Sequence, residues 1–236
     1  MPAEFRSFFR WGQGLDEELH AVLTALGYCN TISEENRTDF YLDLGSDFIG
    51  AKVRAGKKWE CKYKVEDAFG IESYVKKKYG KAAFAIYAAE VRLAMQELIG
   101  VSPSESFDEL LHGATVALRK SRRMLPGTSP SIGIEVCMIE VTGSSWVSIA
   151  IEGDSFEELY AELQLDKYSA LFRLLLGVAA NSPRGSWVLG GYPRFVRSIN
   201  EGLTDRDYEY MASNIRQMDK AILGGLAWEV FIGALL

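Results

Sequence analysis

The stretch that decides the fold is residues 51–65, which read AKVRAGKKWECKYKV. Two runs of β-type residues, 48–54 and 58–65, flank Ala55-Gly56-Lys57, which has the length and the glycine of a three-residue hairpin loop. Such a loop places Lys52 opposite Glu60 and Arg54 opposite Lys58. Side chains alternate along a strand, so one face of the sheet carries the even-numbered residues. These are Lys52, Arg54, Lys58, Glu60, Lys62 and Lys64.

A second basic strand is predicted at 114–124, with Lys120 and Arg122 on one side and Arg119 and Arg123 on the other. Like charges on one buried face cost several kcal/mol each unless they are paired. One interpretation is a solvated sheet face or an edge strand protected by lysines. The other is a sheet curled into a barrel, whose interior of cations and acids would bind a polyanion such as a phosphate chain.

The rest of the chain predicts an α+β fold with a mostly antiparallel sheet. Period-two alternation predicts strands at 4–9 and 37–44 and a hairpin over 132–152. Helical periodicity predicts helices at 15–26, at 83–99, from Ser155 with a capping box to Glu158, after 167, and at about 204–223, with a turn-rich stretch at 181–194. We expect one domain over 1–236, with a barrel at about 4–165 and a helical part at about 166–236.

Composition excludes several classes of protein. The chain has 236 residues, 48% of them hydrophobic, which excludes a disordered chain. No apolar run reaches the roughly 18 residues of a membrane span, and the N-terminus lacks the apolar stretch of a signal peptide. Three widely spaced cysteines, Cys29, Cys61 and Cys137, are expected to be reduced thiols. We therefore expect a cytoplasmic protein without a membrane partner.

Acidic and basic residues are distributed unevenly along the chain, so the charge of each segment is more informative than the net charge. The chain carries 26 Lys and Arg against 32 Asp and Glu, a net charge of −6, which argues against a partner such as a long nucleic acid. The acids gather on expected helices such as 154–166, whereas the cations gather on the expected strands 52–64 and 119–123. The lysine run 76–81 is either a solvated face or a basic tunnel mouth. An acidic exterior with a basic lumen would select a small phosphate chain.

Several short motifs, taken in order, resemble the CYTH superfamily, the triphosphate tunnel metalloenzymes. The motifs are RTDFYLDL at 37–44, the stretch 51–65, GIESYVKKKYG at 70–80, VALRKSRRM at 116–124, and IEVCMIEVTGSSWVSIAIEGDSFEEL at 134–159. The resemblance covers about residues 4–165 and implies an antiparallel eight-stranded β-barrel, or tunnel, with helices packed outside. It also implies hydrolysis or cyclisation of a triphosphate-bearing substrate with a divalent metal, Mg²⁺ or Mn²⁺.

The resemblance also implies roles for individual residues. Lys52, Arg54 and Lys62 match the family's basic residues on the first hairpin, and Lys120 with Arg122 matches its Lys-x-Arg pair. Glu152 matches the second acid of a Glu-x-Glu-Gly strand. Glu140 lies where the family usually has an acid, and Glu135 competes for that role, because a two-residue Gly143-Ser144 turn would pair it with Glu152. The expected phosphate-binding residues are Arg6, Lys52, Arg54, Lys62, Arg119, Lys120 and Arg122, the expected metal ligands are Glu4, Glu140 and Glu152, and the expected catalytic acids are Glu152, Glu140 and Glu135.

Two departures from the family pattern concern the metal. The family opens with Glu-x-Glu-x-Lys, whereas this chain reads Glu4-Phe5-Arg6-Ser7-Phe8, with Arg6 in place of a carboxylate. Ala150 replaces the first acid of the later Glu-x-Glu pair. Losing two carboxylates weakens the binding of a divalent ion, because affinity follows ligand charge. The anion-binding half of the site is therefore kept, and the metal half is eroded.

Three functional hypotheses follow. The first is a divalent-metal-dependent phosphohydrolase of a small triphosphate, and the alternative is a catalytically degenerate protein that binds a phosphorylated ligand without hydrolysis. The third is a structural module whose basic face pairs internally with acids. The apolar C-terminal stretch ILGGLAWEVFIGALL packs on the domain or on a second subunit, which would give a homodimer.

Overall fold

The computed structural model describes residues 1–54, 58–79 and 115–222. The helix expected at 83–99, Lys81 and most of the apolar C-terminal stretch lie outside these residues. The described strands are β1 (Ala3–Arg10), β2 (Ser33–Leu42), β3 (Ile49–Arg54), β4 (Lys58–Ala68), β5 (Ile71–Tyr79), β6 (Thr115–Pro126), β7 (Gly133–Val141), β8 (Ser144–Gly153) and β9 (Trp187–Leu189). The described α-helices are α1 (Asp16–Ala25), α4 (Phe156–Leu163), α5 (Ser169–Asn181), α6 (Tyr192–Glu201) and α7 (Asp205–Ile222).

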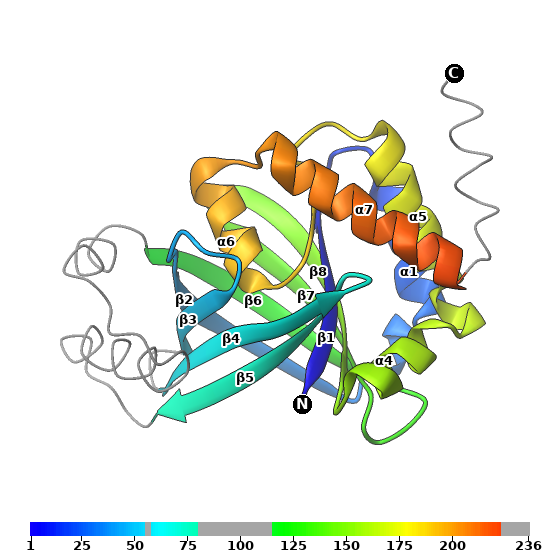
Figure 1. Ribbon diagram of the computed structural model, residues 1–236, viewed down its shortest axis with the longest axis horizontal. Coiled ribbons are helices and arrows are strands. Elements are labelled where there is room, and N and C mark those ends of the chain that lie inside the picture. The colour runs from blue at the N-terminus through cyan, green and yellow to red at the C-terminus, as the bar shows by residue number, and fades with distance from the viewer. Residues whose placement is uncertain (55–57, 80–114, 223–236) are drawn as a thin grey trace.

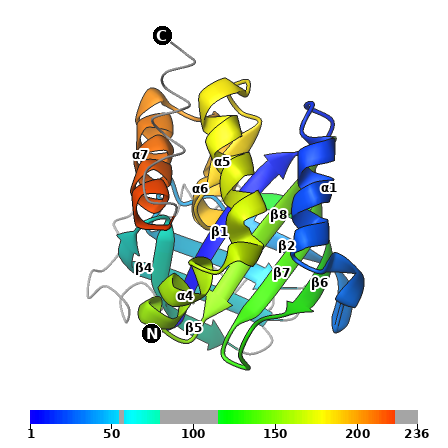
Figure 2. The ribbon, with the colours of Figure 1, turned by 90° about the vertical axis from the view of Figure 1, so that its right-hand side faces the viewer.

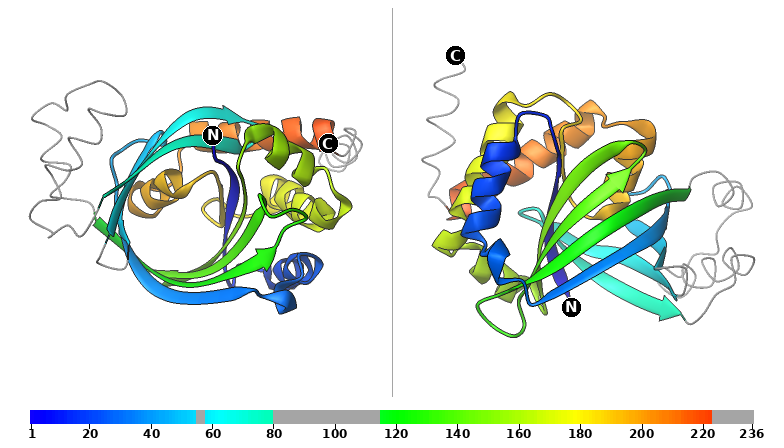
Figure 3. Two further views of the ribbon diagram at one scale, coloured as in Figure 1. Left: turned by 90° about the horizontal axis from the view of Figure 1, so that it is seen from below. Right: turned by 180° about the vertical axis from the view of Figure 1, so that it is seen from behind.

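Eight of the described strands close into an antiparallel barrel, which confirms the predicted α+β tunnel fold. The order β5-β4-β3-β2-β6-β7-β8-β1 returns on itself because the start of β1 also pairs with β5, Ala3 lying opposite Ser73. The end of β1 pairs instead with the short strand β9. Seen from below, the strands form a ring (Figure 3). Closure gives these eight strands an inner and an outer face, although β1 and β5 pair only over Ala3–Phe5 and Ile71–Ser73, and β5 extends beyond that pairing.

The basic hairpin has the register that the sequence predicts. Lys52 lies opposite Glu60 and Arg54 opposite Lys58 on β3 and β4. The hairpin of β7 and β8 turns at Thr142-Gly143, both with positive φ, rather than at Gly143-Ser144. Its register therefore differs by two residues from the expected one. Because side chains repeat with period two, Glu135 and Glu152 still share one face.

Helices cover one side of the barrel, as Figures 1 and 2 show for α1, α4, α5 and α7. The outward side chains of β1 form part of the core with them; Phe5, for example, meets Phe172 of α5 edge to face at 6.2 Å. Helix α4 begins after Ser155, whose hydroxyl accepts a hydrogen bond from the Glu158 amide at 3.2 Å, as in the predicted capping box. None of the described helices combines the length and the apolar character needed to cross a membrane.

Helix α6 closes one end of the barrel. Phe195 stacks on Phe8 of β1 at 4.1 Å, and Tyr192 stacks on Tyr41 of β2 at 4.8 Å. The ring of Pro193 lies so close to Gly50 of β3 that a Cβ there would be 2.7 Å from it. The predicted turn-rich stretch 181–194 thus contains a strand, β9, and the start of this plug. Tyr192, Phe195, Val196 and Ile199 recur at helical spacing, so the apolar pattern does indicate a helix here. What it does not indicate is that Tyr192 and Phe195 pack against side chains on the inner face of the barrel.

Candidate functional site

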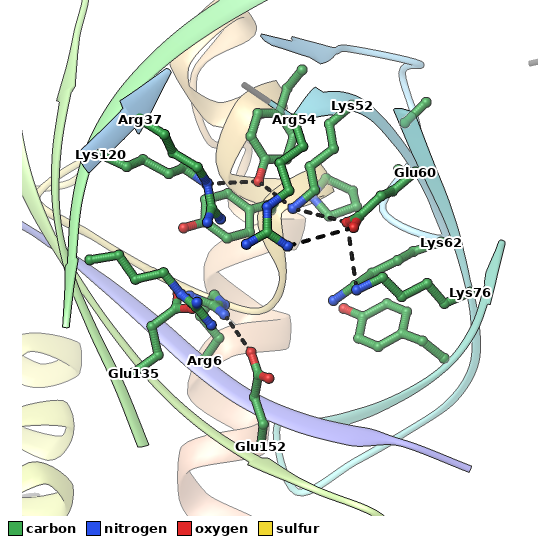
Figure 4. Close-up of a pocket in the computed structure, with 17 residues that line it drawn as sticks. Arg6, Arg37, Lys52, Arg54, Glu60, Lys62, Lys76, Lys120, Glu135 and Glu152 are labelled. Carbon is green, nitrogen blue, oxygen red and sulfur yellow. Dashed lines mark hydrogen bonds and ion pairs between the residues drawn. The ribbon is translucent and has the colours of Figure 1, made fainter. Parts of the chain in front are cut away.

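The inner face of the barrel is lined with charge around a cavity. The cavity encloses roughly 720 Å³ of empty space with its open mouth included, and its lining contains eight basic and three acidic residues. The basic residues are Arg6, Arg37, Lys52, Arg54, Lys62, Lys76, Lys120 and Arg122, and the acids are Glu60, Glu135 and Glu152. Figure 4 shows these side chains directed inward from different strands. The predicted basic lumen is present.

One group of residues in the lumen, the Arg6 cluster, places three carboxylates around a single cation. The guanidinium of Arg6 on β1 donates to Glu4 at 2.5 Å, to Glu135 of β7 at 2.8 Å and to Glu152 of β8 at 3.3 Å. It also donates to the hydroxyl of Ser148 at 2.8 Å. The Arg6 side chain is only 3% exposed. All three of its nitrogens are therefore used within the barrel wall.

Two further cations flank the Arg6 cluster. Lys62 lies 2.9 Å from the second oxygen of Glu4, and Arg122 donates to the second oxygen of Glu135. Three cations thus face three carboxylates, and the group is balanced without any added ion. A divalent ion needs carboxylate oxygens that can turn toward it. Here Glu4 and Glu135 have both oxygens engaged, so these residues do not fit the metal that the fold resemblance implies.

The protonation of the three acids reflects these contacts. Burial alone would raise the pKa of Glu4, but Arg6 and Lys62 outweigh it and hold that pKa well below its usual range. Burial likewise opposes ionisation of Glu135, and Arg6 and Arg122 lower its pKa. The pKa of Glu152 is raised instead, by burial and by the charges of Glu4 and Glu135. Its contact with Arg6 is the longest of the three, so that attraction does not compensate.

A second group, the Glu60 cluster, has the opposite composition: one carboxylate lies among three cations. Glu60 of β4 contacts Lys52 at 3.3 Å, Lys76 at 3.5 Å and Arg54 at 3.8 Å. Figure 4 shows the two clusters facing one another across the lumen. Burial opposes ionisation of Glu60, but Lys52 and Lys76 lower its pKa. Burial also lowers the pKa of Lys52 and of Lys76. Neutralisation of this cluster by its own acid is incomplete.

The closed end of the cavity holds a buried lysine between two tyrosines. Lys120 of β6 donates to the phenol of Tyr41 at 2.7 Å, lies 3.5 Å from the ring centroid of Tyr192, and contacts Asp39 at 3.4 Å. Burial and the charge of Lys52 together lower its pKa well below the usual value. The phenol oxygen of Tyr192 is buried and has no hydrogen-bond partner within the part of the chain that the structure describes.

The structure brings most of the sequence-predicted residues together. Arg6, Lys52, Arg54, Lys62, Lys120, Arg122, Glu135 and Glu152 line the cavity, and Glu4 lies directly behind Arg6. Arg119 and Glu140 do not belong to it. They pair with each other on the outside of the barrel, with side chains 78% and 70% exposed. The structure therefore corrects their assignment to the site. Side chains alternate between the two faces along β6 and β7, and Arg119 and Glu140 each occupy an outward-facing position next to an inward-facing one.

Other lining residues were not expected from the sequence. Arg37 and Tyr41 lie on the same face of β2, and the alternation over 37–44 could have marked them. Of the lysine run 76–81, Lys76 lines the cavity, whereas Lys77 and Lys78 are exposed and Lys81 lies outside the described residues. Tyr192 begins a helical apolar pattern, but that pattern does not show that its side chain reaches the lumen, because the helix lies far along the chain from the strands.

The comparison with solved structures agrees with this fold. No protein-family model and no curated protein matches the sequence. The structure of HpAC1 from Hippeastrum, described as an adenylyl cyclase candidate with a dominant triphosphatase activity, matches with a TM-score of 0.51 and 14% identity, over 87% of this chain and 98% of that chain. This likeness confirms the CYTH-like tunnel fold.

Two weaker likenesses accompany it. A conserved hypothetical protein from Pyrococcus furiosus has a TM-score of 0.41 and 14% identity, over 81% of this chain and 98% of that chain. An adenylate cyclase candidate from Bacillus halodurans has a TM-score of 0.36 and 13% identity, over 68% of this chain and 86% of that chain.

Proposed function

We propose that this chain binds a small triphosphate or another short polyphosphate inside its barrel. The observation that carries the proposal is the Glu60 cluster, in which Lys52, Arg54 and Lys76 surround one carboxylate on the lumen side of the barrel. Two further acids lie nearby, Asp39 at 4.0 Å from Lys52 and the partly exposed Glu35 at 3.2 Å from Arg54. Cations gathered in a partly desolvated cavity repel one another, and a bound anion relieves that repulsion. Arginine forks bind phosphate oxygens in pairs, and lysines add point charges.

The shape of the cavity favours a short ligand. Its closed end is blocked by Tyr192 and Pro193 of α6. A second hollow shares Lys62, Tyr74, Lys76 and Glu152 with the cavity and continues to Pro2 and Asp154 on the surface. A phosphate chain could enter from that side and end near Lys120. A long nucleic acid could not pass through a barrel that is plugged at one end.

The polar groups at the closed end also suit a terminal phosphate. The Tyr192 hydroxyl, buried and unpartnered among the described residues, could donate to a phosphate oxygen. An anion beside Lys120 would favour the charged ammonium and so raise the pKa that burial lowers.

Isothermal titration calorimetry with tripolyphosphate, pyrophosphate and orthophosphate, in the presence of EDTA, tests the proposal. Tripolyphosphate should bind most tightly. Lys52→Ala and Arg54→Ala should each weaken its binding about 10- to 100-fold, since a charge-assisted contact contributes about 1.5–3 kcal/mol. The matched control is Arg119→Ala, which removes an arginine from the outer face. Equal losses in the lumen and control variants, or unchanged affinity in all of them, would contradict the proposal.

Hydrolysis of the bound chain is the second candidate, and one observation favours it. The side chain of Glu152 is 41% exposed, lines the cavity and has a raised pKa, which are the properties of a general base. It would accept a proton from the water that attacks the terminal phosphorus. The bond between that phosphorus and its bridging oxygen would break, releasing orthophosphate, and the shortened phosphate chain would leave with the electron pair, its charge stabilised by the lumen cations. The description of HpAC1 names a triphosphatase activity.

Release of orthophosphate from tripolyphosphate, measured with Mg²⁺, with Mn²⁺ and with EDTA, separates the two candidates. If the chain is a hydrolase, Glu152→Gln should abolish release and leave binding within a few-fold. Glu140→Gln, an acid on the outer face, should leave release unchanged. Tight binding without release under all three conditions would leave the binding function alone.

A further inference from the structure

We propose that Arg6 takes the place of a divalent metal ion in this barrel, so that the chain holds its phosphate ligand without metal. The statement about the ligand rests on the proposed function, whereas the statement about metal does not. The observation behind both is that one guanidinium is the common partner of Glu4, Glu135 and Glu152.

The three carboxylates converge on the guanidinium of Arg6. They come from three neighbouring strands, β1, β7 and β8, and converge because Glu4 lies opposite Glu152 and Glu135 opposite Ala150. Left alone, three buried carboxylates would repel one another. Something positive must lie between them, and in this chain it is Arg6 of β1 itself. Among the described residues no group of acids, histidines and cysteines is arranged to hold a metal.

The guanidinium is fixed in position and cannot easily give way to an ion. The Arg6 side chain is 3% exposed, and its Cζ lies 4.7 Å from the ring centroid of Tyr192, which belongs to the plug helix. Ser148 accepts a further hydrogen bond from it. A divalent ion that entered would therefore meet a buried positive charge as well as acids already neutralised.

Because the cation at this site is the side chain of Arg6, the site does not need a bound metal ion to balance its carboxylates. A metal ion dissociates and is removed by chelators, whereas the charge of an arginine is permanent at any physiological pH. The basic residues around Glu60 face the same lumen and can hold phosphate oxygens directly. Phosphate binding should then be insensitive to chelation of metal.

The first test measures Mn²⁺ binding to the unmodified chain by electron paramagnetic resonance, in which protein-bound Mn²⁺ loses its sharp signal. No bound Mn²⁺ is expected at millimolar concentrations. Submillimolar binding that Glu152→Gln abolishes would overturn the inference. This measurement needs no variant of Arg6, so it stands even if such a variant does not fold.

The second test creates the site that Arg6 occupies. In Arg6→Ala the three carboxylates lose their shared cation, so the melting temperature should fall and Mn²⁺ should raise it again by binding the folded state. Arg119→Ala, an outward-facing arginine, is the control and should show neither effect. A destabilised Arg6→Ala protein that Mn²⁺ neither binds nor stabilises would show that these carboxylates do not form a cation site, which would overturn the inference.

The third test separates this inference from the proposed function. Tripolyphosphate is titrated in EDTA and again in Mg²⁺, and the affinity for the free anion in EDTA should be at least as high. Binding that requires Mg²⁺ would refute the metal-independent site and leave the proposed ligand intact. If nothing binds under either condition, the proposed function fails, while the Mn²⁺ measurements still decide the role of Arg6.

Discussion

The Arg6 cluster and the Glu60 cluster are opposite in composition, although they share one lumen. Arg6 is a single cation among three carboxylates, and Glu60 is a single carboxylate among three cations. Arg6 donates to Glu4 at 2.5 Å and to Glu135 at 2.8 Å, and only its bond to Glu152 is as long as 3.3 Å, whereas all contacts of Glu60 lie between 3.3 and 3.8 Å. Both clusters arise from the same period-two alternation of strands.

The difference lies in how far each cluster is neutralised by its neighbours. Lys62 and Arg122 complete the charge balance around Arg6. Of the cations around Glu60, Arg54 also contacts Glu35 at 3.2 Å, but the Glu35 side chain is 42% exposed and solvent weakens that pair. Lys52 lies 4.0 Å from the buried Asp39, which Lys120 contacts more closely at 3.4 Å. The Arg6 cluster therefore stabilises the barrel, whereas the Glu60 cluster leaves positive charge that a ligand can neutralise.

Replacing Arg6 tests this contrast with the largest expected effect. Arg6→Met keeps most of the side-chain volume but leaves three buried acids without their common cation. Breaking a buried ion pair from one side costs about 3–5 kcal/mol, and chemical denaturation at pH 7 measures it. Arg119→Met, on the outer face, should change the free energy of unfolding by less than about 0.5 kcal/mol. A loss below about 1 kcal/mol in Arg6→Met would show that the carboxylates are not held as ions.

Acid should destabilise the chain through the same cluster. Glu4 and Glu135 have lowered pKa values, because Arg6 and its neighbours outweigh burial. Their contribution to stability is fully present above the ordinary carboxyl pKa of about 4.3 and is lost as pH falls toward the folded values, typically about 2 kcal/mol for each such group. The melting temperature should therefore fall steeply below about pH 4.

The slope of that fall identifies its source. Glu135→Gln removes one of the titrating groups, so its melting temperature should depend less on acid, whatever its value at neutral pH. Glu140→Gln removes an exposed acid and should keep the slope of the original chain. Equal slopes in all three proteins would place the acid sensitivity elsewhere and remove the distinction between the two clusters.

The sequence predicts the Glu60 cluster better than the Arg6 cluster. The basic face of β3 and β4 follows from the spacing around Ala55-Gly56-Lys57, and its register is confirmed. That Arg6 stands where a carboxylate is expected follows from the resemblance of the motifs to the CYTH pattern. What Arg6 does instead does not follow from it, because the three acids that it binds are brought to it by pairing between strands far apart in the chain.

The local sequence pattern also does not show which of two neighbouring strand residues faces the lumen. Arg119 and Lys120 are neighbours of the same charge, yet one is exposed and the other buried. Alternation puts them on opposite faces, and barrel closure determines which face is inside. Strand alternation cannot predict the position of Tyr192, because Tyr192 belongs to helix α6 and contacts Tyr41 of β2 from there.

Neutralising Glu60 tests the other side of the contrast. Glu60→Gln leaves Lys52, Arg54 and Lys76 without the carboxylate that they surround, so the unliganded chain should lose about 1–3 kcal/mol, as expected when a buried charged group loses its partner. Affinity for tripolyphosphate should rise several-fold, because an internal competitor of the ligand is gone. Glu140→Gln should change neither quantity. Weaker binding by Glu60→Gln would mean that Glu60 positions the cations for the ligand.

The smallest expected effect concerns Glu152, the acid that Arg6 holds least closely. Its raised pKa means that its charge costs stability, a cost absent below the ordinary carboxyl pKa and growing as pH rises through the folded value. Glu152→Gln should therefore raise the melting temperature at pH 8 and leave it unchanged at pH 4. Because the side chain is 41% exposed, the gain should stay below about 1 kcal/mol.

Thermal melting at the two pH values, with Glu66→Gln as an exposed control on β4, measures this effect. A lower melting temperature of Glu152→Gln at pH 8 would mean that the 3.3 Å contact with Arg6 outweighs repulsion by Glu4 and Glu135. All three acids would then be held equally by Arg6. The expected gain would instead show that the ionised Glu152 is repelled by Glu4 and Glu135. Glu152 would then be the acid of the cluster that is available for chemistry in the lumen.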